Sequence, residues 1–165
     1  MEYRHVLDPD RKEEICRCIL LALPAWFGDL KAVRQYAKQA REQFFLCAMD
    51  GEDPVGFLAA LEHSFVACEI TVMGVLPSFH RRGIGQKLLE ACARSFRARG
   101  YHYLTVKTLA DTADSASYVK TRAFYLAEGF EPLEIFETLW NKDSPCLYMV
   151  KPLFELQGDY DLDFS

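Results

Sequence analysis

The sequence predicts an α/β fold, in which a mixed, mostly antiparallel sheet of about six or seven strands is flanked by about four helices. Three observations indicate this fold. Segments with apolar residues at helical spacing alternate along the chain with short β-rich runs. Polar turns separate several of the β-rich runs, as they do in hairpins. One strand–helix–strand segment, from Val72 to Val106, requires a parallel strand pair with a right-handed crossover.

The N-terminal part is predicted to hold one short strand and two helices. Residues 3–7 fit the strand. Apolar residues at helical spacing then follow Asp8, and Pro24 is expected to end that helix because proline cannot continue it. Asp29 is suited to cap a second helix, in which apolar residues recur at steps of three and four.

The remaining elements complete the order β, αα, βββ, α, β, α, ββ. Glycine and polar turns mark most of their ends, and Asp114 is expected to cap the last helix. In chain order they are strands at 44–49, 55–61 and 67–75, a helix at 83–99, a strand at 101–106, a helix that ends at Gly129, and strands at 131–139 and 145–153.

Length and composition predict one folded domain, residues 1–155, followed by an acidic and flexible tail, residues 156–165. The chain has 165 residues, close to the size of one domain, and its 50% hydrophobic and 26% charged residues are typical of a globular protein. Its net charge of -5 disfavours nucleic acid and anionic membranes as partners.

The sequence gives no sign of a membrane span, a secretion signal or a metal site. The longest apolar run, Cys18–Phe27, is interrupted by Pro24 and is too short to cross a bilayer. The first residues lack the apolar core of a secretion signal, so we expect a cytoplasmic protein with reduced core cysteines. Its histidines and cysteines lack the spacing of metal ligands, so no metal is predicted.

A basic segment with two glycines, residues 80–87, lies between a predicted strand and a predicted helix. The free N–H groups at a helix start attract anions, and glycine lets a phosphate approach the backbone closely. The spacing of Gly83 and Gly85 matches neither the dinucleotide-binding fingerprint nor the P-loop. The segment therefore predicts a cradle for a phosphate ligand of another kind.

Two motifs resemble those of the GNAT superfamily of N-acetyltransferases. His80-Arg81-Arg82-Gly83-Ile84-Gly85 resembles the Arg/Gln-x-x-Gly-x-Gly/Ala pyrophosphate loop, although its first residue is His80. Forty residues later, Phe124-Tyr125-Leu126-Ala127-Glu128-Gly129-Phe130 resembles the second signature, Phe/Leu-Tyr-x-x-x-Gly-Phe. The predicted element order fits the same fold from about Tyr3 to Leu153. The resemblance implies acetyl-CoA as donor and an amine as acceptor.

The resemblance also implies which residues hold the cofactor. It assigns the pyrophosphate to the loop and the pantetheine arm to the end of the preceding strand. The site of an asparagine that often touches the arm is occupied by Tyr118. The expected cofactor-binding residues are Val75, Leu76, Arg81, Arg82, Gly83, Ile84, Gly85, Gln86 and Tyr118.

Acetyl transfer requires a base, because an ammonium has no lone pair with which to attack the thioester. By resemblance, Glu69 on the strand before the loop is the expected base, and His63 or Glu62 is the alternative holder of a relay water. By the same resemblance, Tyr125 is expected to protonate or stabilise the departing thiolate. Cys68 offers a covalent alternative, although no Cys/His pairing in the sequence singles it out.

The resemblance assigns the choice of acceptor to the first helix pair and to the last hairpin. The first carries Trp26 and Phe27, and the second carries Trp140. Aromatic residues with Glu134 and Glu137 are suited to a cationic amine, and the net charge mildly favours polyamine, aminoglycoside-like, amino-acid-like or peptide amines. The leading hypothesis is direct transfer in a ternary complex. A non-catalytic acyl-CoA sensor and a purely structural domain remain alternatives. Relatives that pair through C-terminal strands suggest a homodimer.

Overall fold

The computed structural model describes residues 1–110 and 115–154. The predicted tail, residues 156–165, and the predicted helix cap Asp114 lie outside this range. The described residues form seven strands, four α-helices and one short 3-10 turn, in the predicted order. The mixed α/β fold and its single parallel strand pair are thereby confirmed.

The elements begin and end within a few residues of the predicted positions. In chain order they are β1 (Glu2–His5), α1 (Pro9–Leu21), α2 (Leu30–Ala40), β2 (Phe44–Asp50), β3 (Asp53–Glu62), β4 (Ala67–Val75), the 3-10 turn η1 (Pro77–Phe79), α3 (Ile84–Ala98), β5 (Tyr103–Leu109), α4 (Ala116–Ala127), β6 (Glu131–Asn141) and β7 (Ser144–Pro152).

Local chemistry explains the two N-terminal helices. The Asp8 carboxylate accepts from the backbone N–H of Asp10, and Pro9 occupies the first turn, where no N–H is needed. The Asp29 carboxylate accepts from the N–H of Lys31 at 2.9 Å and so begins α2. The first helix ends before Pro24, as predicted, and Leu23 beyond its end is still buried.

The predicted strand 101–106 is displaced in the structure, where it spans Tyr103–Leu109. Its end is fixed by β7, because every residue from Tyr103 to Leu109 has an antiparallel partner there. Pairing with a later strand is not visible in a local pattern, so the sequence placed this strand too early. For the last helix the structure places the N-cap at Ser115.

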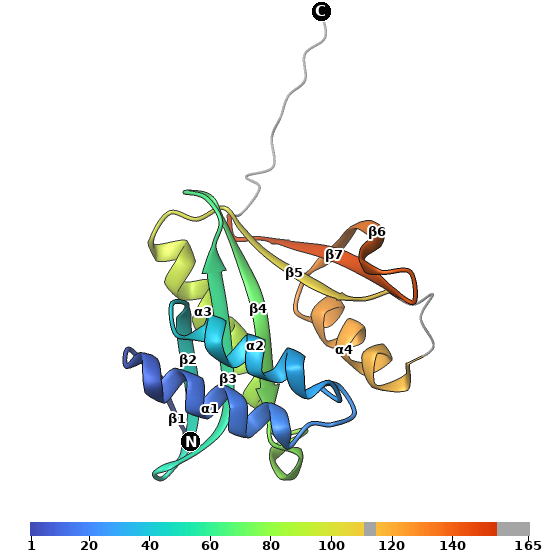
Figure 1. The fold of residues 1–165 in the computed structure, drawn as a ribbon. Coiled ribbons are helices and arrows are strands. Elements are labelled where there is room, and N and C mark those ends of the chain that lie inside the picture. Colours follow the sequence, from blue (N-terminus) through green and yellow to red (C-terminus); the bar gives the residue numbers. More distant parts are fainter. Residues whose placement is uncertain (111–114, 155–165) are drawn as a thin grey trace, which may run out of the picture.

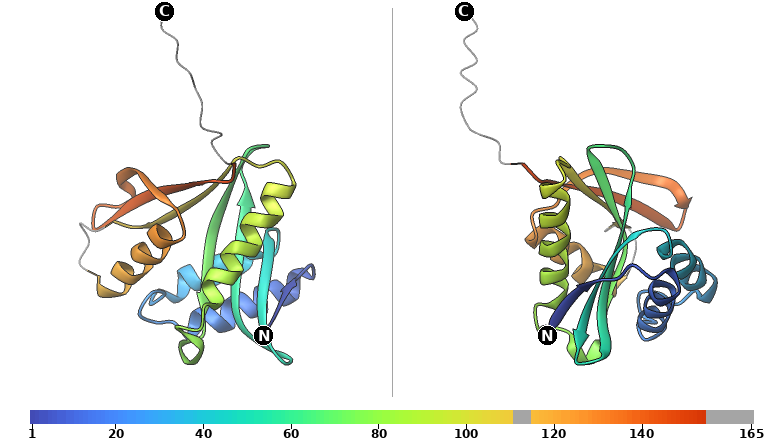
Figure 2. Two further views of the ribbon diagram at one scale, coloured as in Figure 1. Left: turned by 180° about the vertical axis from the view of Figure 1, so that it is seen from behind. Right: turned by 90° about the vertical axis from the view of Figure 1, so that its left-hand side faces the viewer.

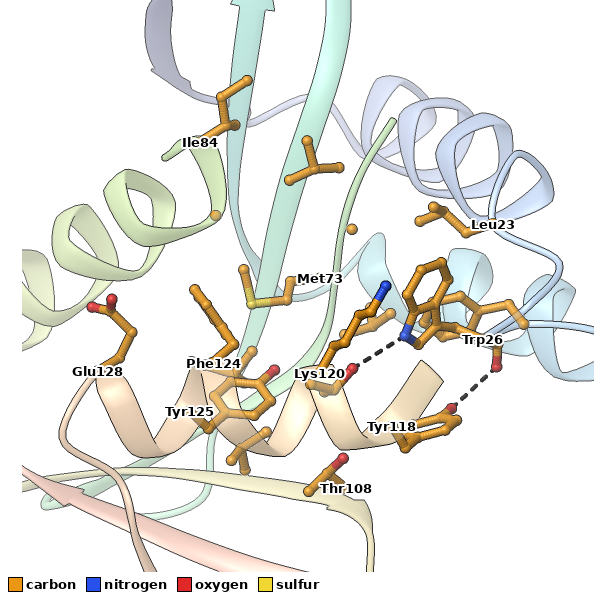
Figure 3. A pocket seen from close by; sticks show the side chains of 18 of the residues that line it. Leu23, Trp26, Met73, Ile84, Thr108, Tyr118, Lys120, Phe124, Tyr125 and Glu128 are labelled. Atoms are coloured by element: carbon orange, nitrogen blue, oxygen red, sulfur yellow. Dashed lines mark hydrogen bonds between the residues drawn. The ribbon is translucent and has the colours of Figure 1, made fainter. Parts of the chain in front are cut away.

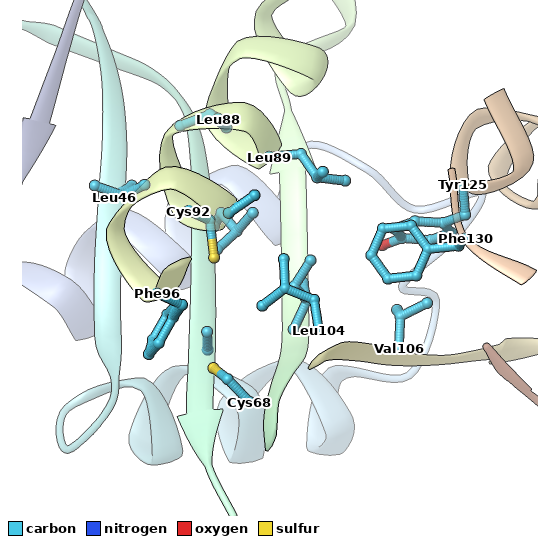
Figure 4. Packing of buried hydrophobic residues seen from close by; sticks show 14 of the residues in the cluster. Leu46, Cys68, Leu88, Leu89, Cys92, Phe96, Leu104, Val106, Tyr125 and Phe130 are labelled. Atoms are coloured by element: carbon cyan, nitrogen blue, oxygen red, sulfur yellow. The ribbon is translucent and has the colours of Figure 1, made fainter. Parts of the chain in front are cut away.

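The sheet runs in the order β1-β2-β3-β4-β5-β7-β6. Helices α1 and α2 cover one face, and α3 and α4 cover the other (Figures 1 and 2). One buried cluster packs α1 and α2 against β2–β4, with Phe45 stacked on Phe57 at 5.3 Å. A second cluster lies under α3 and reaches Tyr125 and Phe130 (Figure 4).

The parallel pair in the middle of the sheet is short. Strands β4 and β5 are paired only from Ala67–Tyr103 to Ile70–Val106, and beyond this point β5 turns away with β7 (Figure 1). A bulge in the β3–β4 pairing lies at the same level, between Ile70 and Val72. The sheet therefore opens at its centre, and this opening positions the candidate site.

Candidate functional site

A pocket of about 570 Å³ fills the opening between β4 and β5 (Figure 3). Its walls come from β4, β5, α4, the loop before α3 and the segment between α1 and α2. This volume lies within the range of about 300–1,000 Å³ that small-molecule sites occupy. A second hollow, of about 470 Å³, lies elsewhere and involves residues near Glu42 and Arg99.

One wall of the pocket is a free strand edge. Gly56 and Val75 are register partners, yet the N–H of the next residue, Leu76, donates to the Val55 carbonyl at 2.8 Å. This pattern marks Gly56–Val75 as a non-hydrogen-bonded pair, so the N–H and C=O of Val75 point away from β3. Met73, two residues earlier, has the same orientation, and β5 has already parted from β4 here. Both residues thus direct backbone groups into the pocket.

His80 covers part of this edge. Its Nε2 lies 2.6 Å from the Val75 carbonyl oxygen, so a protonated Nε2 donates a hydrogen bond there. Its ring also meets Trp26 edge-on, with 5.9 Å between ring centroids. The residue that departs from the GNAT pattern therefore occupies a backbone acceptor of the pocket wall.

The loop before α3 has the backbone shape of an anion cradle. Arg81 and Gly83 both have left-handed backbones, with φ of 62° and 73°. Turns of this kind let successive amide N–H groups converge on an anion. Gly83 is the N-cap of α3 and brings no side chain to the N–H groups of the first turn, which contains no acidic residue. The positive end of the α3 dipole therefore faces the pocket, and no acidic side chain in the first turn neutralises it.

The space around two glycines distinguishes one that is needed for core packing from one that leaves room for a ligand. A Cβ at Gly74 would lie 2.8 Å from Leu23 Cδ1, so the protein's own core requires that glycine. A Cβ at Gly85 would meet only van der Waals neighbours, at 3.6 Å from Phe124 and 3.7 Å from Met73. The fold itself therefore tolerates a side chain at Gly85, whereas a ligand against the first turn of α3 would not.

Tyr125 presents its hydroxyl to the same pocket (Figure 3). The residue is only 5% exposed, and its ring packs against Phe130 and Phe124 at 5.3 Å each. Burial raises the pKa of Tyr125 well above its usual range. The hydroxyl is therefore protonated at neutral pH and can donate a proton or a hydrogen bond.

Trp26 bridges the two sides of the opening (Figure 3). Its indole Nε1–H lies 3.1 Å from Thr121 Oγ1 and 3.2 Å from the Ser117 carbonyl, both on α4. In return the Tyr118 hydroxyl donates to the Trp26 carbonyl at 3.1 Å. These hydrogen bonds join the segment between α1 and α2 to α4 across the pocket. Tyr118 is thus engaged with Trp26, in addition to lining the site where a cofactor contact was predicted.

Three titratable side chains meet where β4 and β5 separate. Glu69 Oε1 lies 2.6 Å from His63 Nε2 and 3.2 Å from Lys107 Nζ. The Glu69 side chain is 11% exposed and that of His63 is 46% exposed, so the group runs from the sheet interior to solvent. Lys107 lines the pocket, whereas Glu69 is not part of the lining and contacts it through Lys107. The alternative carboxylate, Glu62, instead pairs with Arg99.

The structure gathers most of the predicted site residues around one pocket. Those that line it are Trp26, Phe27, Val75, Arg81, Gly83, Ile84, Gly85, Gln86, Tyr118, Tyr125 and Trp140. Three predicted residues lie outside the lining, namely Glu69, Leu76 and Arg82. The Arg82 guanidinium stacks instead on the Phe79 ring, 4.8 Å from its centroid. Leu76 packs against both core clusters.

Other sequence suggestions fall away from the pocket. Glu134 and Glu137 are exposed on β6 and do not line it. Cys68 is fully buried beneath α3, and burial raises its pKa to about 12, so it is a protonated thiol and not a nucleophilic thiolate at neutral pH. Among residues 1–110 and 115–154, no three His, Cys, Asp or Glu side chains are grouped to hold a metal ion.

Sequence reasoning missed several lining residues, above all Tyr36, Lys107 and Lys120. Alternation along β5 puts Lys107 on the face opposite Val106, but it does not reveal that β4 parts from β5 at this point. Lys120 and Tyr36 come from two helices on opposite faces of the sheet, which only the tertiary fold brings together. None of the described helices is long and apolar enough to cross a membrane.

Comparison with known protein families decides the identity. The sequence model of the GNAT acetyltransferase domain matches residues 40–132, more than half of the chain. The chain belongs to the GNAT acetyltransferase family. No curated protein sequence matches it significantly.

Solved structures share the GNAT fold at low sequence identity. A GNAT-family protein from Desulfovibrio desulfuricans has a TM-score of 0.78 at 16% identity, over 93% of this chain and 99% of its own. The aminoglycoside 6'-N-acetyltransferase from Enterococcus faecium has a TM-score of 0.72 at 19% identity, over 94% and 98%. A GNAT acetyltransferase from Elizabethkingia anophelis with acetyl-CoA bound has a TM-score of 0.65 at 17% identity, over 92% and 97%.

Proposed function

We propose that this GNAT protein is an acetyl-CoA-dependent N-acetyltransferase that transfers the acetyl group directly to an amine in a ternary complex. One observation carries the proposal. The free edge of β4, the left-handed loop before α3 and the protonated hydroxyl of Tyr125 all face a single pocket. An extended ligand with an anionic end and a reactive thioester fits this arrangement. The GNAT acetyltransferase that holds acetyl-CoA supports the choice of ligand.

Backbone groups bind the cofactor in this proposal. The N–H groups of residues 81–86 receive the pyrophosphate at the start of α3, and Arg81 adds a positive charge from the pocket wall. The backbone of Met73 and Val75 receives the amides of the pantetheine arm, and His80 releases the Val75 carbonyl as the arm binds. Acetyl-CoA itself supplies an electrophilic thioester carbonyl and a thiolate leaving group.

Glu69 takes the proton of the acceptor amine, directly or through a water. His63 and Lys107 both contact Oε1 of Glu69, and no described residue donates to Oε2. That second oxygen is therefore the one available to the amine. His63, nearly half exposed on the other side of Oε1, provides a route for the proton to solvent. The predicted base and its predicted alternative act together in this scheme.

Tyr125 assists departure of the thiolate. Its buried and protonated hydroxyl opens on the pocket, and donation of a hydrogen bond or proton to sulfur stabilises the charge that develops there. With Glu69 as the base and Tyr125 as the acid, no covalent acyl-enzyme is needed. The buried thiol Cys68 has no part in the reaction.

Cofactor binding is tested first by thermal unfolding with and without acetyl-CoA. A ligand at about 100 times its dissociation constant stabilises the folded state by about 2.7 kcal/mol. For a domain of this size that corresponds to a rise in Tm of roughly 5–10 °C. Thiol release with a panel of amines, measured with a disulfide reagent, then tests transfer. Release of CoA without any dependence on an amine contradicts N-acetyl transfer.

Substitution of Tyr125 distinguishes the enzyme from a non-catalytic acyl-CoA sensor of the same fold. Tyr125→Phe keeps the ring and its packing but removes the hydroxyl. We expect kcat to fall about 100-fold, within the usual range for loss of a general acid, while the Kd of acetyl-CoA changes by less than about twofold. A sensor would show the same Kd but no turnover in either protein.

A further inference from the structure

The charges that line the pocket are distributed unevenly. Among the lining residues that the structure describes, the permanent cations are Arg81, Lys107 and Lys120, and the carboxylate is Glu128. Arg81 belongs to the anion cradle before α3. Glu128 lies at the end of α4 farthest from Trp26 (Figure 3). Lys107 and Lys120 belong to neither of these places, so we assign them to the end of the pocket near Trp26.

That other end is aromatic. It is lined by Trp26 and Phe27 from the segment between α1 and α2 and by Tyr36 from α2, and Trp140 from β6 also lines the pocket. We call these four residues the aromatic end of the pocket. Phe27 and Tyr36 meet edge-on at 6.0 Å, and Trp26 is fixed by its hydrogen bonds to α4. Such a surface can pack against a planar or branched apolar group.

Lys107 is held in place beside the point of reaction. It follows Val106, the last β5 residue paired with β4, and its side chain is one-third exposed. Its Nζ lies 3.2 Å from Glu69 Oε1, which fixes its position and neutralises the charge of Glu69. An ammonium has three donors, so donors remain for a second acceptor group from the pocket side.

We infer that the acceptor is an amine that also carries a carboxylate and an apolar or aromatic group, as an aromatic amino acid does, and that Lys107 binds its carboxylate. The inference rests on the proposed function, since it names the acceptor of the same site. In an α-amino acid the carboxylate and the amine are two bonds apart, so a carboxylate on Lys107 brings the amine to the opening beside Glu69. The apolar group then lies against the aromatic end.

The same charges disfavour polycations. Each amine of an aminoglycoside or polyamine would enter a partly desolvated pocket that holds Lys107 and Lys120. The lining carboxylate, Glu128, lies at the far end of α4, and Glu69, beside Lys107, is already paired. Like charges in such a site repel more strongly than they do in water. Although the Enterococcus faecium relative acts on aminoglycosides, this pocket is suited to a smaller zwitterionic substrate.

Matched acceptors test the inference. We compare phenylalanine with phenylalaninamide, and tyrosine with tyramine, as acceptors at pH 7.5 with saturating acetyl-CoA. The amide has the less basic amine, so reactivity alone favours it over the amino acid. We expect kcat/KM to be at least tenfold higher for each carboxylate-bearing partner, a difference of about 1.4 kcal/mol. Kanamycin and spermidine serve as polycations, and a higher kcat/KM for either of them overturns the inference.

Variants of Lys107 test whether this residue causes the preference for a carboxylate-bearing acceptor. In Lys107→Gln the ratio of kcat/KM between acid and amide is expected to fall at least tenfold, whereas Lys107→Arg keeps most of it because the charge is retained. Lys38→Gln, on the exposed side of α2, is the matched control and keeps the full ratio. If Lys107→Gln slows acid and amide equally, Lys107 serves the chemistry or the fold and the inference is wrong.

A binding measurement separates this inference from the proposed function. Calorimetric titration of N-acetylphenylalanine and its amide into the CoA-saturated protein needs no turnover. Tighter binding of the acid, lost in Lys107→Gln, supports the carboxylate site even if no acceptor is acetylated, in which case only the enzymatic proposal fails. Equal or absent binding of both compounds overturns the inference, whatever the Tm shift with acetyl-CoA.

Discussion

The two ends of the pocket offer different chemical groups to a ligand. We call the end formed by the free edge of β4 and the loop before α3 the cofactor end. At the cofactor end, the groups available to a ligand are backbone N–H and C=O groups of β4 and of the loop before α3. At the other end, they are the aromatic side chains of α2, β6 and the segment before α2, together with Lys107 of β5 and Lys120 of α4. The first end is set by the local course of one continuous stretch of chain. The second depends on how five distant segments meet.

This difference explains which kind of specificity each end can provide. Most point mutations leave backbone groups in place, so ligand binding at the cofactor end is expected to be insensitive to most side-chain changes. Side chains at the aromatic end can be replaced singly without loss of the loop or the strand edge. Acceptor choice can therefore change while the cofactor is kept.

The largest effect is expected where the two ends meet, at Glu69. Glu69→Gln removes the proposed base and should lower kcat about 100-fold or more at neutral pH. The loss should shrink as the pH rises, because a growing fraction of the acceptor amine is then neutral in solution. Steady-state rates between pH 6.5 and 9.5 measure both effects. An equal loss in Glu62→Gln, whose carboxylate pairs with Arg99, would argue against Glu69 as the specific base.

A side chain at Gly85 should damage the cofactor end alone. The fold has room for the methyl group of Gly85→Ala, and alanine favours the helix, so the Tm of the ligand-free protein should not fall. We expect the Kd of acetyl-CoA to rise about tenfold, about 1.4 kcal/mol, and the Tm shift with acetyl-CoA to shrink accordingly.

The control for Gly85 is Gly51, a left-handed glycine in the β2–β3 turn far from the pocket. Gly51→Ala should lower the stability of the free protein by about 1 kcal/mol, the cost of a left-handed non-glycine residue, and leave the acetyl-CoA shift unchanged. If both variants behave alike, a steric role of Gly85 toward the ligand is disproved.

The smallest effect is expected at the bridge between the two sides of the pocket. Trp26→Phe removes the indole donor to Ser117 and Thr121, and Tyr118→Phe removes the donor to the Trp26 carbonyl. Each should lower stability by about 1 kcal/mol, a fall in Tm of roughly 2–4 °C. Because both hold the same bridge, the double variant should lose less than the sum. Fully additive losses would show two independent contacts.

The sequence was sufficient for the fold, and at the cofactor end it named most of the residues that line the pocket, although Leu76 and Arg82 lie outside the lining. Pro24, Asp29 and the glycines at the helix ends mark boundaries through local chemistry, and the loop around Gly83 combines a backbone requirement with a recognisable spacing. The roles assigned to Glu69 and Tyr125 remain predictions, but the structure brings both to the opening of the sheet.

The other end could be predicted only in part, because Trp26, Phe27 and Trp140 were named from the sequence, whereas Tyr36, Lys107 and Lys120 were missed. Lys107 lines the pocket because β5 stays paired with β7 up to Leu109, whereas β4 is no longer paired with β5 after Ile70. Nothing in the residues around Lys107 indicates that separation. The contact of His80 with Val75, and the engagement of Tyr118 with Trp26, are likewise products of tertiary packing.

The free edge of β4 has a consequence for solubility. An unpaired strand edge with exposed N–H and C=O groups is a template on which a strand of another molecule can add. Here such an edge lies in the middle of the sheet, along the part of β4 after Ile70 that is not paired with β5. His80 occupies the Val75 carbonyl, and the Trp26 bridge spans the opening, so the ligand-free protein carries its own protection against strand addition. Removal of His80 is therefore expected to promote aggregation of the ligand-free protein and not of the protein saturated with cofactor.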